Sequence, residues 1–260
     1  MRDVIEHYNK LIDENNDPAR DPKPLRDYMD KWDGEKFIEN MRLDKSKSVL
    51  EIGIGTGRLA IKVAPICKSL CGIDISEKTI RRATENLSTY QNIKLICGDF
   101  MSCEFESQFD VIYSSLTFMH IQDKLSAIQK IASLMTNNGL FVLSIDKNQN
   151  EYIDMGDRKI KIYPDNPKDI RSYLSITKLK IVNEFETDHA YVTVSTKASL
   201  VYREAFVFTY ALSIFLTTTD LIKDTKAIII IIIFLSNSEA LLTNRQSCGK
   251  IYSSHKLHMF

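Results

Sequence analysis

The chain has 260 residues, enough for one large or two small domains with an ample core. Its 34 lysines and arginines equal its 34 aspartates and glutamates, and this zero formal charge argues against a dedicated nucleic-acid-binding protein, which usually carries a basic excess. The five cysteines form no C-x-x-C pair and the histidines lack zinc-ligand spacing, so we predict no metal site and interpret the cysteines as ordinary small side chains, with a reactive thiol as the alternative.

The amino-terminal residues 1–7 are charged and lack the apolar core of a signal peptide, so we expect a cytoplasmic protein. Apolar side chains at helical spacing predict a helix within residues 1–16. The prolines at positions 18, 22 and 24 predict a loop after it, and a second short helix is predicted over 36–43. Residues 1–44 therefore form a helical segment ahead of the first strand.

A glycine-rich segment follows at 49–57, with the sequence Val-Leu-Glu-Ile-Gly-Ile-Gly-Thr-Gly. An apolar run that breaks into alternate glycines and then takes up helical spacing predicts a strand, a tight loop and a helix over 58–66, the unit that holds nucleotide-like ligands. These glycines lack a Cβ, so the chain can turn sharply and a ligand can lie against the backbone. Glu51 is expected at the carboxyl end of the strand, where open α/β sheets bind ligands.

A second apolar run, 70–73, ends at Asp74, which is placed to accept hydrogen bonds from ribose hydroxyls. Ser76 is the predicted N-cap of a helix over 77–87. The dinucleotide fingerprint G-x-G-x-x-G requires a glycine where Arg58 stands. A nicotinamide-dependent oxidoreductase is therefore disfavoured.

The glycine spacing, preceded by the acidic Glu51, resembles the first motif of the class I S-adenosylmethionine-dependent methyltransferases. The resemblance implies that the loop with Gly53, Gly55 and Gly57 holds the methionyl end of S-adenosylmethionine. It also implies that an acid at the position of Asp74, with Ile75 beside it, holds the ribose.

The resemblance continues in chain order over roughly residues 25–197. The segment Cys-Gly-Asp-Phe at 97–100, after the apolar run 93–96, looks like the adenine site of the family, with Asp99 near the exocyclic amine and Phe100 against the ring. In the family the segment before the first strand caps the cofactor site, so two aromatic residues of this segment are candidate lid or substrate residues. Their alternative role is to cover the edge of the sheet. These residues are Tyr28 and Trp32.

The predicted fold class is α/β, a Rossmann-like doubly wound sheet of seven strands, mostly parallel with an antiparallel C-terminal hairpin. Further strands are predicted at 109–115, 140–145, 160–163, 179–185 and 191–195, and further helices at 124–135, capped by Asp123, and 167–174. In the family the last two strands complete the sheet. We therefore assign 1–44 as a helical cap, 45–197 as the S-adenosylmethionine-binding methyltransferase domain, and 198–260 as an appended tail.

The loop after the fourth strand is expected at the edge of the sheet where substrate approaches. His120 in this loop is a candidate general base that would titrate near neutrality, with helix packing as its alternative role. Asp146, at the end of the fifth strand, is a second candidate base. Ser115 is assigned to the cofactor site and Tyr113 to the substrate side. The alternative for both is that they fill space in the sheet. Asp110 is expected to have a structural role.

The tail from 198 contains an isoleucine-rich run at 227–235. None of its apolar runs reaches the roughly 20 residues that a membrane-spanning helix needs. We favour an extension produced by a frameshift or read-through, without a catalytic role, over a membrane anchor. An intact reading frame shared by close relatives through residue 260 would refute this interpretation.

The predicted function is methyl transfer from S-adenosylmethionine to an oxygen or nitrogen of a small molecule, without nucleic-acid or membrane partners. Because the sulfonium is already activated, the protein chiefly aligns the acceptor, and a general base is optional. One alternative is a nucleic-acid or protein methyltransferase, against which stands the absence of an Asn-Pro-Pro-Tyr-like tetrad after the fourth strand. The other is a non-catalytic S-adenosylmethionine-binding protein, although the motif residues are intact.

Overall fold

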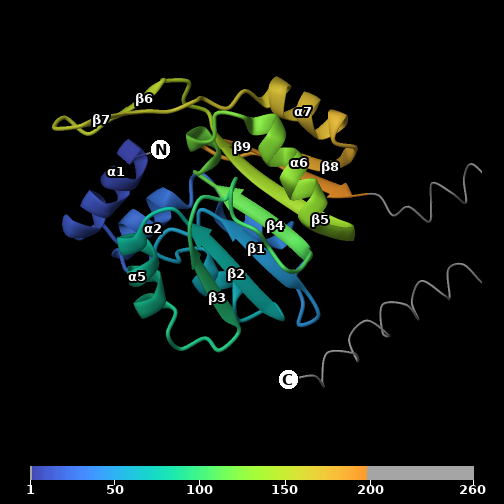
Figure 1. The fold of residues 1–260 in the computed structure, drawn as a ribbon, viewed down its shortest axis with the longest axis horizontal. Helices are drawn as coiled ribbons and strands as arrows, with labels where there is room; N and C mark the ends of the chain where they lie inside the picture. The colour runs from blue at the N-terminus through green and yellow to red at the C-terminus, as the bar shows by residue number, and fades with distance from the viewer. Residues whose placement is uncertain (1, 198–260) are drawn as a thin grey trace, which may run out of the picture. The chain divides into compact units, whose positions relative to one another are not determined.

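The computed structural model describes residues 2–197, which include a seven-stranded sheet of order β3-β2-β1-β4-β5-β9-β8 (Figure 1). Strands β1 to β5 pair in parallel, and β9 and β8 add antiparallel strands beyond β5. The predicted α/β fold with its closing antiparallel hairpin is confirmed. The seven strands are β1 (Ser48–Ile52), β2 (Ser69–Asp74), β3 (Ile93–Cys97), β4 (Phe109–Ser115), β5 (Met135–Asp146), β8 (Leu179–Glu186) and β9 (Ala190–Lys197). The predictions for the tail lie outside the described residues.

Helices cover both faces of the sheet, because its central strands bury side chains on both sides. Val49 and the next residue, Leu50, belong to different core clusters, as the alternation of side chains along a strand requires. One cluster includes residues of α3, α4 and α5, and the other includes residues of α6 and α7. These helices are α3 (Gly34–Glu39), α4 (Ala60–Val63), α5 (Glu77–Asn86), α6 (Lys124–Leu134) and α7 (Pro167–Ile176).

Local sequence signals explain where several helices begin and end. The side chain of Ser76 accepts a hydrogen bond from the backbone of Thr79 at the start of α5, and Asp123 accepts one from Ser126 at the start of α6. Both predicted N-caps are therefore confirmed. The helix predicted over 58–66 is shorter: α4 begins at Ala60 and ends at Val63, just before Pro65, whose ring and missing N–H oppose the continuation of an α-helix.

The amino-terminal segment contains α1 (Arg2–Asp13) and one helix that we did not predict, α2 (Lys23–Met29). Pro24 lies in the first turn of α2, where a missing backbone N–H costs nothing, so the proline starts this helix and does not mark a loop. The helix predicted over 36–43 is confirmed as α3, although α3 begins at Gly34 and ends at Glu39.

A small hairpin of β6 (Tyr152–Asp154) and β7 (Lys159–Lys161) lies beside α1 (Figure 1). Arg158 joins the two, because its guanidinium binds the carboxylate of Glu14 at 2.7 Å and donates to Nδ1 of His7 at 3.0 Å. The strand predicted over 160–163 corresponds to β7, which begins one residue earlier, ends two residues earlier and pairs outside the main sheet. Among residues 2–197, no helix has the length and apolar character needed to cross a membrane.

Candidate functional site

A cavity of about 630 Å³ lies at the carboxyl ends of the parallel strands. Its sheet wall consists of residues at the ends of β1, β2 and β4 and in the segments directly after β1, β2, β3 and β4, namely those lining it within 51–59, 73–75, 98–101 and 115–117. The opposite wall of the cavity is the helical cover, which we define as residues 2–34. It contributes side chains of α1, α2 and the segment between them. The loop after β4 and Tyr163 complete the lining.

The glycine loop after β1 depends on the absence of side chains at specific positions. Gly53 has φ +76°, and a Cβ on it would lie 1.9 Å from Oγ1 of Thr117, so any side chain there collides with the loop after β4. Gly55 has φ +56° and open space around its hypothetical Cβ. Both line the cavity, whereas Gly57 does not and packs against Leu87. The backbone at Gly55 is therefore open to a ligand.

Asp74, at the end of β2, lines the cavity together with Ile75. Its two carboxylate oxygens accept hydrogen bonds from the backbone N–H groups of Gly55 and Ser76, each at 3.0 Å. Burial raises the pKa of Asp74, against the opposing effect of these backbone donors. The side chain is thus held at the glycine loop, where the sequence placed it.

Glu51 is 4 % exposed at the end of β1 and lines the same cavity. Burial raises its pKa to about 8, although the hydroxyl of Tyr113 donates a 2.7 Å hydrogen bond to it. Tyr113 itself is fully buried and does not line the cavity, so the structure gives it a role in holding Glu51 and no contact with the substrate side.

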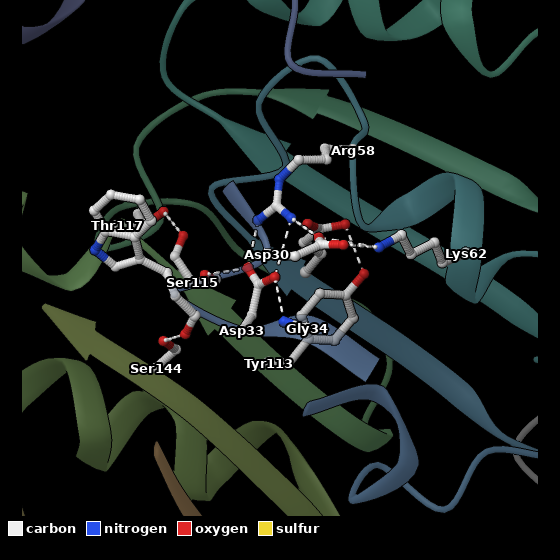
Figure 2. A network of polar contacts seen from close by, with 11 residues as sticks. Asp30, Asp33, Gly34, Arg58, Lys62, Tyr113, Ser115, Thr117 and Ser144 are labelled. Carbon is white, nitrogen blue, oxygen red and sulfur yellow. Dashed lines mark hydrogen bonds and ion pairs between the residues drawn. The ribbon is translucent and has the colours of Figure 1, made fainter. Parts of the chain in front are cut away.

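Arg58 fastens the helical cover to the glycine loop (Figure 2). Nη1 of its guanidinium donates to Asp30 and Asp33 at 3.0 Å each, and Nη2 forms a further bond to the fully buried carboxylate of Asp33. Asp33 also accepts a 2.9 Å hydrogen bond from Ser115, and Lys62 binds Asp30 at 3.1 Å. The residue that distinguishes this loop from the dinucleotide fingerprint is therefore the centre of a buried ion-pair network. Sequence reasoning noted Arg58 but missed its two partners.

His120 lies in the short helix η1 (Phe118–His120) after β4 and lines the cavity. The hydroxyl of Tyr8, on α1, lies 2.7 Å from its Nε2, and its Nδ1 is buried without a hydrogen-bond partner among the described residues. Burial lowers the pKa of His120 to about 4, with nearby positive charge acting in the same direction. The expected titration near neutrality is therefore wrong, because the burial of His120 depends on residues far from it in the chain.

The remaining candidate residues divide between the cavity and its surroundings. Asp99, Phe100, Ser115 and Tyr28 line the cavity. Trp32 does not line it and packs against His189 in a tilted arrangement with ring centroids 4.5 Å apart, which fits the alternative role of covering the sheet edge. Asp146 is also outside the lining, and its carboxylate accepts a 2.7 Å hydrogen bond from the backbone of Asn148.

Two other predictions concern residues far from the cavity. Asp110, at the opposite edge of the sheet, accepts hydrogen bonds from Ser48 and Thr136 and so joins β1, β4 and β5. Its expected structural role is confirmed. Among the cysteines within 2–197, none forms a disulfide, and Cys67 and Cys71 are buried. No group of three or more His, Cys, Asp or Glu side chains suited to a metal ion is found in the described part of the chain.

The strand order, the glycine loop and the acid that ends β2 define the class I, Rossmann-like methyltransferase fold. The family model described as a methyltransferase domain matches residues 49–139, which run from β1 into the first part of β5. Residues 49–139 therefore match a methyltransferase domain, and the described residues share the fold of solved S-adenosylmethionine-dependent methyltransferases.

Relatives and solved structures support this assignment. An uncharacterized methyltransferase of Anoxybacillus flavithermus is 34% identical over 121 residues, which are 45% of this chain and 56% of that protein. An uncharacterized methyltransferase of Bacillus cereus is 31% identical over 112 residues, or 42% of this chain and 52% of that protein. The chain thus spans about half the length of the curated relatives it matches.

Two solved structures share the fold at low sequence identity. Magnesium protoporphyrin IX methyltransferase (ChlM) from Synechocystis, with bound S-adenosylmethionine, has a TM-score of 0.60 and 18% identity, covering 75% of this chain and 95% of its own. The N-methyltransferase NodS from Bradyrhizobium japonicum, in complex with S-adenosyl-L-homocysteine, has a TM-score of 0.55 and 17% identity. The match covers 76% of this chain and 100% of the NodS chain.

Proposed function

We propose that this chain is an S-adenosylmethionine-dependent methyltransferase that acts on a small molecule. The observation that carries the proposal is the convergence of Gly55, Asp74, Asp99 and Phe100 on one cavity, in the chain order of the family motifs. Its volume of about 630 Å³ lies within the range of about 300–1,000 Å³ that is usual for sites of small ligands.

The residues of the sheet wall fit this cofactor. Gly55 leaves open space against which a methionyl group can lie, and Asp74 offers a carboxylate suited to two ribose hydroxyls. Asp99 and Phe100 offer an acceptor for an exocyclic amine and a ring face for adenine. When bound, S-adenosylmethionine supplies a methyl group activated by a sulfonium. The chain's own task is then to bind and align the acceptor, which can contribute on the order of 7 to 11 kcal/mol to the rate.

A small acceptor is favoured over a nucleic acid by the charge of the cavity. Arg58 is the one lysine or arginine that lines it within 2–197, and its guanidinium is already bound by Asp30 and Asp33. A polyanion would meet carboxylates without free cations, which is the opposite of a nucleic-acid site. ChlM, whose name gives magnesium protoporphyrin IX as its acceptor, adds support by analogy of fold.

His120 keeps its place as the candidate base, with two conditions set by its surroundings. At neutral pH the ring is uncharged, so a lone pair is present, but the low pKa makes it a weak base. Tyr8 lies against Nε2, so an acceptor proton would reach His120 only after that contact is exchanged. Alignment alone is therefore the main contribution that we assign to this cavity, and Asp146 has no part in it.

Calorimetric titration tests the proposal, with S-adenosylmethionine, S-adenosyl-L-homocysteine and the nicotinamide nucleotides measured in parallel. We expect the two adenosyl compounds to bind and the nicotinamide nucleotides not to bind. Nicotinamide binding without adenosyl binding would refute the proposal. Adenosyl binding without methylation of any of a broad panel of small acceptors would favour the non-catalytic alternative.

A further inference from the structure

The lining of the cavity carries an excess of carboxylates. Five acidic residues line it. Among the described residues, Arg58 is the one lysine or arginine in the lining, and its guanidinium is bound by two further aspartates. The five are Asp21, Glu51, Asp74, Asp99 and Asp123. Glu51 keeps its proton below its pKa of about 8, and the other four acids still outnumber Arg58. A cavity of this composition attracts cations and repels anions.

Four of these carboxyl groups have hydrogen-bond donors from the protein. Glu51 accepts from Tyr113, Asp74 from two backbone N–H groups, Asp99 from the backbone of Met101, and Asp123 from the backbone of Ser126. Their orientation is explained by contacts within the fold. Asp21 differs from all four.

The carboxylate of Asp21 makes no hydrogen bond or ion pair with residues 2–197, although the residue is half-buried. Its neighbour Asp17 takes the available partners, since Asp17 is bound by Arg82 and Asn86 at 3.1 Å each. Burial, and then the charge of Asp17, raise the pKa of Asp21. Both effects disfavour the charged form of Asp21 in the folded protein.

The backbone around Asp21 is nevertheless fixed at the cavity. The N–H of Asp21 donates to the carbonyl of Asp17 at 3.0 Å, and the N–H of Ala19 donates to Oγ1 of Thr56, in the glycine loop, at 3.3 Å. Leu25 and Tyr28, on the helix that follows, line the same cavity. The unpaired carboxylate thus stands on a held segment, with apolar and aromatic side chains nearby.

We propose that Asp21 is the residue that recognises an ammonium group inside this cavity, so that the cavity selects cationic over anionic ligands. The inference rests on the proposed function, because two ammonium groups could meet Asp21 there. One is the α-ammonium of the cofactor, and the other is the ammonium of an amine acceptor. An amine would bind as the cation and transfer one proton to Asp21, and its nitrogen lone pair would then attack the methyl carbon as the carbon–sulfur bond breaks towards sulfur.

The Asp21→Asn variant tests the proposal, because asparagine keeps the shape and removes the charge. Loss of a charged hydrogen bond predicts a weakening of about tenfold or more for the ammonium ligand. Calorimetry would compare S-adenosyl-L-homocysteine with its analogue that lacks the α-amino group. On protein saturated with S-adenosyl-L-homocysteine, it would then compare 2-phenylethylamine with phenylacetate. Asp27→Asn is the matched control, because Asp27 lies on α2, binds Lys23 and does not line the cavity.

The outcomes separate the two sources of the ammonium group. Weaker binding of S-adenosyl-L-homocysteine, with the deaminated analogue unaffected, assigns Asp21 to the cofactor. Unchanged cofactor affinity, with loss of the preference for 2-phenylethylamine over phenylacetate, assigns it to the acceptor. If both comparisons match the wild-type protein, the inference is wrong, whereas a wild-type protein that binds no adenosyl compound refutes the proposed function. The melting temperature of Asp21→Asn should equal or exceed that of the wild type, which a merely structural carboxylate would not produce.

Discussion

The two sides of the cavity are held in different ways. On the sheet wall, Gly53 and Gly55 are fixed by backbone geometry, and Asp74 by two backbone donors. The helical cover is held by side chains, chiefly the bonds of Arg58 to Asp30 and Asp33. Backbone geometry tolerates few substitutions, whereas side-chain pairs can be removed one at a time. Mutations on the two sides should therefore have different effects. Substitutions in the sheet wall should weaken ligand binding, and substitutions in the helical cover should lower the stability with which the cover is held to the sheet.

The largest effect is expected from Asp33→Ala on the cover. Asp33 is 1 % exposed and binds the guanidinium of Arg58, so its removal leaves a buried cation with Asp30 as its remaining acid. Breaking a buried pair costs about 3–5 kcal/mol, which chemical denaturation should detect. Lys62→Ala, which removes the more exposed partner of Asp30, is the control and should cost at most about 1 kcal/mol. Equal losses in the two variants would contradict the role given to Arg58.

The next effect concerns Gly53→Ala on the sheet wall. A positive φ costs alanine about 1–2 kcal/mol, and the overlap with Thr117 adds about 1–3 kcal/mol of overpacking. We expect lower stability and a loss of affinity for S-adenosyl-L-homocysteine in calorimetry, because the loop must move. Gly98→Ala provides the comparison for stability alone, since Gly98 also lines the cavity but its hypothetical Cβ meets nothing within 4 Å and its φ is not in the positive range. A Gly53 variant that behaves like the Gly98 variant would show that the loop is less constrained than we infer.

Asp74→Ala should weaken binding of S-adenosyl-L-homocysteine about tenfold or more, because a charged hydrogen bond is worth about 1.5–3 kcal/mol. Asp110→Ala is the matched control at the opposite edge of the sheet, where the carboxylate holds Ser48 and Thr136. It should lower stability and leave the affinity of the folded protein unchanged. An Asp74 variant with wild-type affinity would show that the ribose contact is misplaced.

The smallest effect is a pH dependence carried by Glu51. Its pKa in the folded protein is raised to about 8, so the native state keeps a proton that the unfolded state has lost above its ordinary pKa near 4.5. Stability contributed by this group therefore falls as pH rises towards and through 8, by about 1 kcal/mol between pH 7 and pH 8. Glu51→Gln cannot ionise and should flatten the dependence measured by denaturation over this range. An identical pH profile for variant and wild type would contradict the burial effect on Glu51.

The sheet wall was predictable from sequence because its signals are local. An apolar run, alternate glycines and a terminal acid lie within a few residues of one another, and Ser76 and Asp123 mark helix starts in the same way. The parallel arrangement then brings the strand ends together without further information. Even so, the role of Gly57 differs from the expected one, since it packs against Leu87 and not towards the cavity.

The contacts of the cover were not predictable, because each joins residues far apart in the chain. Arg58 and Asp33 are separated by 25 positions, and Tyr8 and His120 by 112. No local pattern indicates which acid meets Arg58 or which hydroxyl reaches His120, and the pKa of His120 follows from that burial. The two aspartates near Trp32 offered a weak signal, since acids beside an arginine-bearing loop are candidates for a pair.

The hairpin of β6 and β7 has an evolutionary consequence. It is inserted between β5 and α7, pairs outside the main sheet, and meets α1 through the bonds of Arg158 with Glu14 and His7. An insertion of this kind can be lengthened, exchanged or lost in a lineage while the strand order stays intact. Because no residue of β6 or β7 lines the cavity, such a change would leave the cavity wall at the strand ends as it is.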